Sequence, residues 1–304
     1  MSIVTTAQAV PSRLYAIYAA LFDAENGELK DRLEAWATPP SLAGRGADED
    51  GEPSTTLFSN TLQEARRLGL VEDADDRLRL TIEARGGGKK GQASEGYFRA
   101  YLDRTLFDPA RAAQTGQAGF MIALAWFLSA NPLMPMGFAD PPQIGLKLEI
   151  GEQASKTELT SLNRYQNFLY WARYLGFATI VGGRDEEDTN SRRAIPDPSR
   201  AIAGALLVIF SDKGELPIET FLTRLTAIYP VFEKGSVRQE YDLMRLNPSV
   251  DGAHRLSITT SLALQRLEDR QMIALTSTAD APARVLDFGR RESRVSHISL
   301  KGAD

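Results

Sequence analysis

The sequence predicts a mainly α-helical protein with small β-hairpins, organised as tandem winged helix-turn-helix modules. A helix, an apolar turn and an alternating strand occur in this order near residues 59–82, and the order recurs near 161–195 and 259–300. Such internal repeats determine the architecture of a chain. The 304 residues, 43% of them hydrophobic, suffice for two or three modules with buried cores. We expect an N-terminal winged helix over 1–84, a flexible linker over 85–96, a central helical and winged-helix module over 97–198, and a C-terminal winged helix over 199–304.

The first module is expected to hold three helices followed by a hairpin. Ser12 can cap the first helix, which places Leu14, Ile17, Tyr18, Leu21 and Phe22 on one apolar face. The expected elements are a helix from Pro11 or Ser12 to Asp23, a helix over Leu29–Trp36, a helix capped by Ser59 or Asn60 that ends at Gly69, the turn Asp73–Asp76 and the strand Leu78–Ile82.

The second copy follows the same plan. Thr160 or Ser161 caps a helix that ends at Gly176, and Ala65–Leu70 matches Ala172–Phe177. Glycine commonly ends a helix because it adopts the left-handed conformation, which costs other residues about 1 kcal/mol. Strands are expected over 177–181 and 194–195, with the charged loop Arg184–Arg193 as the wing.

The third copy is the most divergent. Its helix is entered through Thr259, Thr260 or Ser261, and Gln271 stands where the other copies have glycine. A strand over Met272–Leu275 and a hairpin that pairs Val285–Phe288 with Val295–Leu300 complete the unit. Further helices are expected over Tyr97–Phe107, Gly119–Ser129, Ala201–Phe210 with Asp197 as cap and Pro198 at the first position, and Ile218–Tyr229 opened by Pro217.

The residues that enzyme active sites require are scarce. The chain has no cysteine and two histidines, His254 and His297, which have no metal-ligand spacing. Gly86–Gly91 lacks the Gly-Lys-Ser/Thr of a phosphate-binding loop, and the acidic run Asp185–Asp188 lacks the spacing of a calcium loop. We therefore expect a protein that is not an enzyme and that has no cofactor or metal.

A local basic face is required if the chain binds nucleic acid, because its net charge is −5. The polar faces of the three repeat helices, Thr259 and Thr260 included, and the last wing are the candidates. Asn and Gln pair with adenine and Arg with guanine, while wing arginines contact phosphate or the minor groove. The candidate DNA-binding residues are Asn60, Gln63, Arg66, Arg67, Asn163, Arg164, Gln265, Arg266, Arg284, Arg290, Arg291 and Arg294.

Two other functions are compatible with this pattern. Winged helices also dock proteins, so the chain is alternatively an adaptor or scaffold for partner subunits, or a transcriptional regulator with a ligand pocket. The start of the chain lacks the features of a signal peptide, and the apolar run Ala118–Leu128 is too short to span a bilayer. We expect a cytoplasmic protein whose partners are double-stranded DNA and other protein subunits, with no membrane.

Several short motifs resemble the DpdG-type proteins. They are Val10–Leu14, Pro39–Leu42, Arg67–Val71, Trp171–Phe177 and Ile195–Pro198. Proteins of this type accompany bacterial systems that place 7-deazaguanine derivatives in DNA and restrict phage. The resemblance implies an accessory role in a multi-protein defence complex, and it supplies no catalytic residue to carry over.

Overall fold

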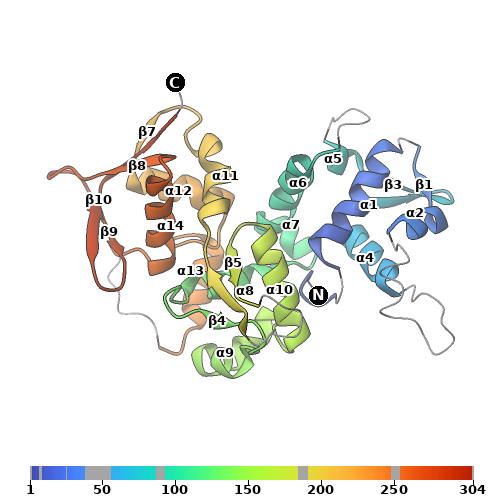
Figure 1. Cartoon of the computed structure of the whole chain (residues 1–304), viewed down its shortest axis with the longest axis horizontal. Helices are drawn as coiled ribbons and strands as arrows, with labels where there is room; N and C mark the ends of the chain where they lie inside the picture. The colour runs from blue at the N-terminus through green and yellow to red at the C-terminus, as the bar shows by residue number, and fades with distance from the viewer. Residues whose placement is uncertain are drawn as a thin grey trace. The chain divides into compact units, whose positions relative to one another are not determined.

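The computed structural model describes residues 2–6, 9–24, 26–37, 56–86, 93–183, 191–247 and 254–302. These residues form helices joined by small antiparallel sheets, which confirms the mainly α-helical class (Figure 1). The chain divides into two compact units, Met1–Ala118 and Gly119–Asp304. The finer division near residues 84, 96 and 198 remains a prediction.

The first unit contains nine described helices and strands. A three-stranded antiparallel sheet has the order β1-β3-β2. Helix α1 buries the apolar face that the sequence predicts, and Tyr18 contacts Phe22 and Phe98. The elements are α1 (Pro11–Asp23), β1 (Glu28–Leu29), α2 (Lys30–Ala37), α4 (Thr56–Arg67), β2 (Val71–Ala74), β3 (Arg77–Leu80), α5 (Ile82–Arg85), α6 (Glu95–Phe107) and α7 (Pro109–Gln114).

The second unit contains two further three-stranded antiparallel sheets. The first has the order β4-β6-β5 and the second β7-β11-β8. The elements of the first half are α8 (Ala118–Ser129), β4 (Met136–Gly137), α9 (Gln143–Ile150), the 3-10 helix η1 (Gly151–Thr157), α10 (Leu162–Tyr174), β5 (Ala178–Val181) and β6 (Arg193–Pro196). Those of the second half are α11 (Ser199–Ile209), β7 (Glu215–Pro217), α12 (Ile218–Ile228), α13 (Ser236–Met244), α14 (Ile258–Asp269), β8 (Ile273–Thr276), β9 (Arg284–Asp287), β10 (Glu292–Val295) and β11 (His297–Leu300).

One order of elements occurs three times, over residues 11–80, 118–196 and 199–300, which we call the three repeats. Each begins with a helix, a short strand and further helices, and it ends with a helix that leads into two strands. In each sheet the last strand lies in the middle and pairs with both others. The segments that the sequence predicts to be copies therefore share one topology. The third repeat adds the hairpin β9–β10 between its last two strands.

The helix endings of the three repeats have the same geometry. Gly69, Gly176 and Gln271 have φ angles of +69°, +82° and +58°. In each repeat the next amide donates a hydrogen bond to the carbonyl five positions earlier, at 2.9, 2.8 and 3.0 Å. This is the Schellman ending, in which a left-handed residue reverses the chain. Gln271 thus occupies the glycine position, as the sequence comparison predicts.

Several predicted helix starts or caps are wrong because hydroxyl residues lie inside the helices. Helix α1 begins at Pro11, one of the two predicted starts, but its capping position is Val10, so the predicted cap Ser12 is wrong. Helix α4 begins at Thr56 rather than after Ser59 or Asn60. Helix α14 begins at Ile258 and is capped by the hydroxyl of Ser257, not by Thr259, Thr260 or Ser261.

Other starts agree with the sequence or differ by one residue. The Ser161 hydroxyl accepts a hydrogen bond from the Arg164 amide and caps α10, as predicted. Helix α11 begins at Ser199, and the Asp197 carboxylate accepts from that first amide although the capping position is Pro198. Helices α6, α8 and α12 lie where the sequence predicts them.

The predicted pairing of the last hairpin is wrong. Strand β9 pairs with β10, whereas β11 pairs with β7 and β8. The central part of the predicted second wing, 184–190, with its acidic run 185–188, lies outside the described residues. In the predicted linker, α5 ends at Arg85 and α6 begins at Glu95, and residues 87–92 also lie outside the described part.

Candidate nucleic-acid interface

Helix α4 presents a polar stripe to solvent. Ser59, Gln63 and Arg66 are exposed and lie four and three positions apart, so they share one face of the helix. Asn60 and Arg67 flank this stripe and are partly exposed. The opposite face is buried because Phe58, Leu62 and Ala65 pack into the first unit. The packing of the apolar face therefore fixes which side chains can reach a partner.

The two arginines of α4 differ in how firmly they are held. Arg66 pairs with Asp73 on β2, and both side chains are well exposed. Such surface pairs contribute little, so a phosphate can replace Asp73 at small cost. Arg67 lies 3.0 Å from the carboxylate of Glu64, whose side chain is 0% exposed. Arg67 compensates a buried charge, which makes it part of the structure of the unit.

Helix α10 carries a second stripe. Asn163, Tyr170 and Arg173 are exposed and Gln166 is partly exposed, at intervals that follow one helical face. Arg164 lies beside this stripe and donates from Nη1 to the Thr160 hydroxyl at 2.9 Å. Tyr170 and Arg173 are not among the residues predicted from the sequence, although continuing the helical period from Asn163 reaches Tyr170 after two turns and Arg173 after nearly three.

Helix α14 differs from α4 and α10 because the hydroxyl residues of its first turn face the interior of the second unit. Thr259 and Thr260 are 1% and 2% exposed, and the Thr259 hydroxyl donates to the Ala130 carbonyl at 2.8 Å. The expectation that these hydroxyls face solvent is therefore wrong. The physical reason is that α14 packs against neighbouring helices of the unit.

The two remaining candidates on α14 are held by acidic neighbours. Gln265 donates hydrogen bonds to Glu268 and Asp269, its neighbours on the same helix. Arg266 Nη1 lies 2.6 Å from the Asp197 carboxylate, which also accepts from the first amide of α11. Burial acts to raise the pKa of Asp197, but the hydrogen bonds from Ser199 and the charge of Arg266 outweigh it and hold the pKa below its ordinary value.

The base of the hairpin β9–β10 is anchored by an ion pair whose arginine is buried. Arg284 is 6% exposed, and its Nη2 lies 3.1 Å from the carboxylate of Glu219 on α12. Lys234 pairs with the same carboxylate. Hydrogen bonds from Arg284, followed by those from Lys234, lower the pKa of Glu219 to about 2. Arg284 thus fixes the hairpin to α12 and is not available at the surface.

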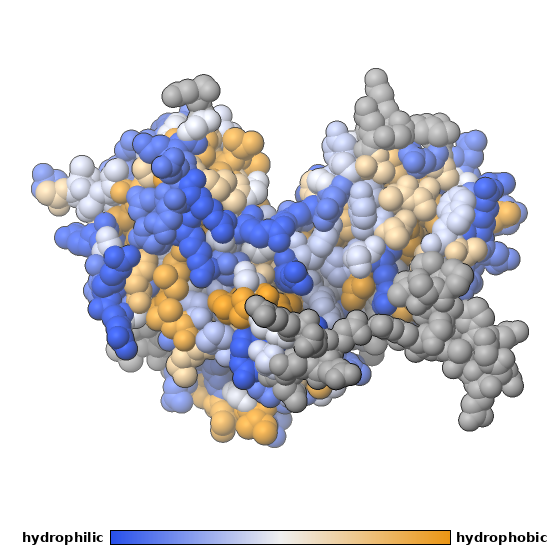
Figure 2. Space-filling view, viewed as in Figure 1, coloured by the Kyte–Doolittle hydropathy of each residue, from blue (hydrophilic) through white to orange (hydrophobic). Residues whose placement is uncertain are grey.

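The outer part of the hairpin carries three exposed arginines. Its two acidic residues, Asp287 and Glu292, are both paired with Arg255, at 3.0 and 2.6 Å. The three arginines have no acidic partner among the described residues, so the hairpin surface has excess positive charge. Hydrophilic surface covers this hairpin in Figure 2. These residues, which we call the hairpin arginines, are Arg290, Arg291 and Arg294.

Neither a membrane span nor a metal-ligand cluster occurs in the described part of the chain. None of its helices combines the length and the apolar character that a bilayer crossing requires. Its His, Asp and Glu side chains do not gather in any set of three or more suited to a metal ion.

Comparison with known proteins gives one match. The model of a family described as DpdG-like matches residues 1–281 and confirms the resemblance seen in the short sequence motifs. The matched region includes all of the first two repeats and the third as far as β8. The comparison with curated proteins and the comparison with solved structures each give no match.

Proposed function

The chain belongs to the DpdG-like family, and from that premise we propose that it is a non-enzymatic DNA-docking subunit of a multi-protein phage-defence complex. The observation that carries this proposal is the set of hairpin arginines, whose positive charge no acidic residue in the described part of the chain compensates. DNA binding depends largely on such charges, because each phosphate contact releases counterions.

We assign a winged helix to each repeat on the basis of topology. A winged helix has three helices and a small sheet in which the first strand pairs with the last, and the third helix enters the major groove. The strand pairing of the three repeats agrees with this plan, and so does the order of elements once the additional helices η1 in the second repeat and α13 in the third are set aside. In the third repeat, β9–β10 lies between β8 and β11, where a winged helix carries its wing.

The three repeats contribute different surfaces under this proposal. In the first two, the stripes on α4 and α10 face solvent and supply side chains for base edges and phosphates. In the third, α14 is packed inside its unit, so the hairpin arginines take over the contact with phosphate or the minor groove. Gln63 and Tyr170 are the central exposed residues of the two helical stripes.

The first test measures fluorescence anisotropy of labelled duplex DNA with the full chain over a range of salt concentrations. The triple variant Arg290→Ala, Arg291→Ala and Arg294→Ala removes three charges. If each arginine contacts a phosphate, the slope of log affinity against log salt falls by about 2 to 3. The matched control replaces three exposed cations outside the proposed surfaces, with Lys156→Ala, Lys213→Ala and Arg270→Ala.

The control separates local contacts from the effect of net charge. We expect it to leave the slope within about 1 of the wild-type value, because long-range effects of exposed charges are screened. Equal losses in the two triple variants, or an unchanged slope in the hairpin variant, would contradict DNA docking through the hairpin.

A second candidate function is a protein adaptor, which exposed apolar side chains favour. Ile144 and Leu148 lie one turn apart on α9 and are 78% and 74% exposed. Exposed apolar side chains on one helix face are typical of a docking surface for another protein. Replacement of both by Ser should abolish co-purification with partner subunits, while duplex binding and its salt dependence remain unchanged.

A further inference from the structure

A pocket in the second unit is not used by the proposed DNA contacts. It has a volume of about 390 Å³ and lies among the end of α8, the segment 136–142, α9 and the start of α10. Trp126 and Tyr165 contribute aromatic rings to its lining, and Asp140 and Glu149 contribute carboxylates. Pockets of this kind, mostly apolar with a few polar groups, are the usual form of a small-molecule site.

Tyr165 gives the strongest indication that a ligand belongs there. Its side chain is 0% exposed, and its hydroxyl has no hydrogen-bond partner within the described ranges. An unpaired buried hydroxyl costs about 1–3 kcal/mol, so native structures usually provide a partner. Burial, and to a smaller extent the nearby Asp140 carboxylate, raises the pKa of Tyr165. The hydroxyl therefore stays protonated and can both donate and accept a hydrogen bond.

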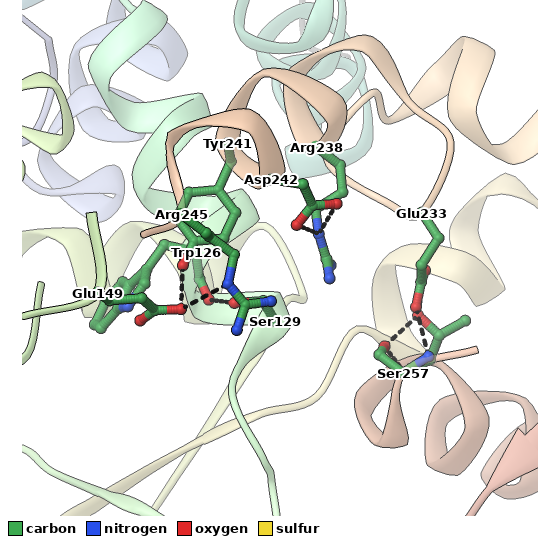
Figure 3. A network of polar contacts seen from close by, with 10 residues as sticks. Trp126, Ser129, Glu149, Glu233, Arg238, Tyr241, Asp242, Arg245 and Ser257 are labelled. Atoms are coloured by element: carbon green, nitrogen blue, oxygen red, sulfur yellow. Dashed lines mark hydrogen bonds and ion pairs between the residues drawn. The ribbon is translucent and has the colours of Figure 1, made fainter. Parts of the chain in front are cut away.

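The other polar groups give the pocket a negative character. The carboxylate of Glu149 already accepts from the Tyr241 hydroxyl at 2.5 Å and pairs with Arg245 at 3.4 Å (Figure 3). Asp140 has no cationic partner in the part of the chain that the structure describes. Helix α8 also ends at Ser129 in the pocket wall, and a helix C-terminus favours positive charge.

We propose that this pocket binds a small organic cation with a flat apolar body. The cationic head lies against Asp140 and the Tyr165 hydroxyl, and the body lies against the ring of Trp126. A cationic head supplies the counter-charge that the Asp140 carboxylate lacks. It also donates a hydrogen bond that the Tyr165 phenol oxygen can accept. The Trp126 ring offers the flat body an apolar surface on which to stack. This activity is separate from DNA docking and does not depend on it.

Gly145 allows the pocket to be closed without disturbing the fold. It lies within α9 in the pocket wall, and a Cβ atom added there meets nothing within 4 Å. Gly145→Leu therefore adds a bulky side chain at the pocket wall with no overlap at its Cβ atom, and leucine favours a helix more than glycine does. Gly204, inside α11, has equally open surroundings and makes Gly204→Leu the matched control.

The experiment compares benzamidine, benzamide and benzoate, which have nearly the same shape and carry positive, zero and negative charge. Calorimetric titration of the full chain should show benzamidine binding at least tenfold more tightly than benzamide, and benzoate binding least. Gly145→Leu should abolish benzamidine binding while Gly204→Leu keeps it. Asp140→Asn should reduce the affinity for benzamidine to that for benzamide.

Tyr165→Phe provides a readout that a purely structural role does not give. Without a probe, it should leave the thermal stability unchanged or raise it, because it removes an unpaired hydroxyl. With benzamidine present, it should weaken binding at least threefold. Equal affinity for the three compounds, no binding of benzamidine, or full binding by Gly145→Leu would overturn the proposal. Duplex binding should be unchanged in every pocket variant, so a failure here leaves the DNA proposal untouched.

Discussion

Gln271 offers a direct test of the equivalence of the three repeats. It adopts φ +58° at the position where the other repeats have Gly69 and Gly176. Its side chain is exposed, so little packing is lost when it is removed. We therefore expect Gln271→Gly to stabilise the second unit, although replacement of a surface residue by glycine ordinarily destabilises a protein.

The magnitude follows from two opposing terms. A residue with a Cβ atom in the left-handed conformation costs about 1–2 kcal/mol. The greater freedom of glycine in the unfolded chain offsets about 0.5–1 kcal/mol of this. Gln271→Gly should thus raise the free energy of unfolding by about 0.5–1 kcal/mol. Gln271→Ala keeps the Cβ atom and should change it by less than about 0.5 kcal/mol.

The reverse substitutions should show how crowded each position is. A Cβ atom added at Gly176 lies 2.9 Å from the Ala201 nitrogen and 2.9 Å from the Arg200 Cβ, both in α11. Gly176→Ala combines backbone strain with this overlap and should cost about 2–4 kcal/mol. At Gly69 the nearest atom is the Tyr101 hydroxyl at 3.3 Å, so with the same offset Gly69→Ala should cost only about 0.5–1 kcal/mol.

Urea denaturation followed by circular dichroism measures these differences, with each variant compared in the transition of its own unit. Thermal unfolding gives an independent order of stability. A destabilised Gln271→Gly variant would refute the reasoning, because it would show that the Gln271 side chain contributes more than its backbone strain costs. A Gly176→Ala variant that is as stable as the wild type would also refute the reasoning.

Two further predictions concern carboxylates that pair with arginine. Glu219→Gln should destabilise the second unit by about 1–2 kcal/mol at pH 7, because it leaves the buried Arg284 without its counter-charge. The pKa of Glu219 is lowered from 4.5 to about 2, so its contribution to the free energy of unfolding is present above pH 4.5 and is lost as the pH falls toward 2. The denaturation curves of variant and wild type should therefore converge over that range. Glu64→Ala should cost the first unit about 2–4 kcal/mol in urea denaturation, because its carboxylate accepts hydrogen bonds from Thr6 and Gln117 and pairs with Arg67. An equal loss for Glu72→Ala, which removes only an exposed surface pair, would contradict this estimate.

The sequence was sufficient to predict the helix endings and the repeats. These features are local, because a left-handed residue and the apolar residue after it fix the turn without distant contacts. Gln271 was identified by alignment with Gly69 and Gly176 although its residue type gives no such indication. The very short first strands, such as β1 and β4, could not be predicted, since two residues are too few to show a strand period.

Helix starts and side-chain exposure were predicted less well because they depend on distant contacts. Ser59 and Asn60 are good capping residues, yet α4 extends one turn further toward Thr56. Thr259 and Thr260 look like solvent-facing residues, but their hydroxyls bond to the Ala130 carbonyl and the Glu233 carboxylate. Partners more than 20 positions away are invisible to a local pattern, and they decide which polar residues reach the surface.

The way in which acidic residues pair with the candidate arginines explains how an acidic chain can still present a basic surface. Some of these arginines have an acidic partner, and others have none among the described residues. Asp197 neutralises Arg266 on α14, and Glu219 neutralises Arg284 at the base of the hairpin. Arg255 in turn neutralises both acidic residues of the hairpin and leaves its outer arginines unpaired. A net charge of −5 therefore gives no measure of the local field there, since screening limits each charge to about 8 Å at physiological salt. Under the proposed function, Arg255→Ala, which frees two carboxylates beside the hairpin, should therefore weaken duplex binding although Arg255 is not one of the proposed DNA contacts.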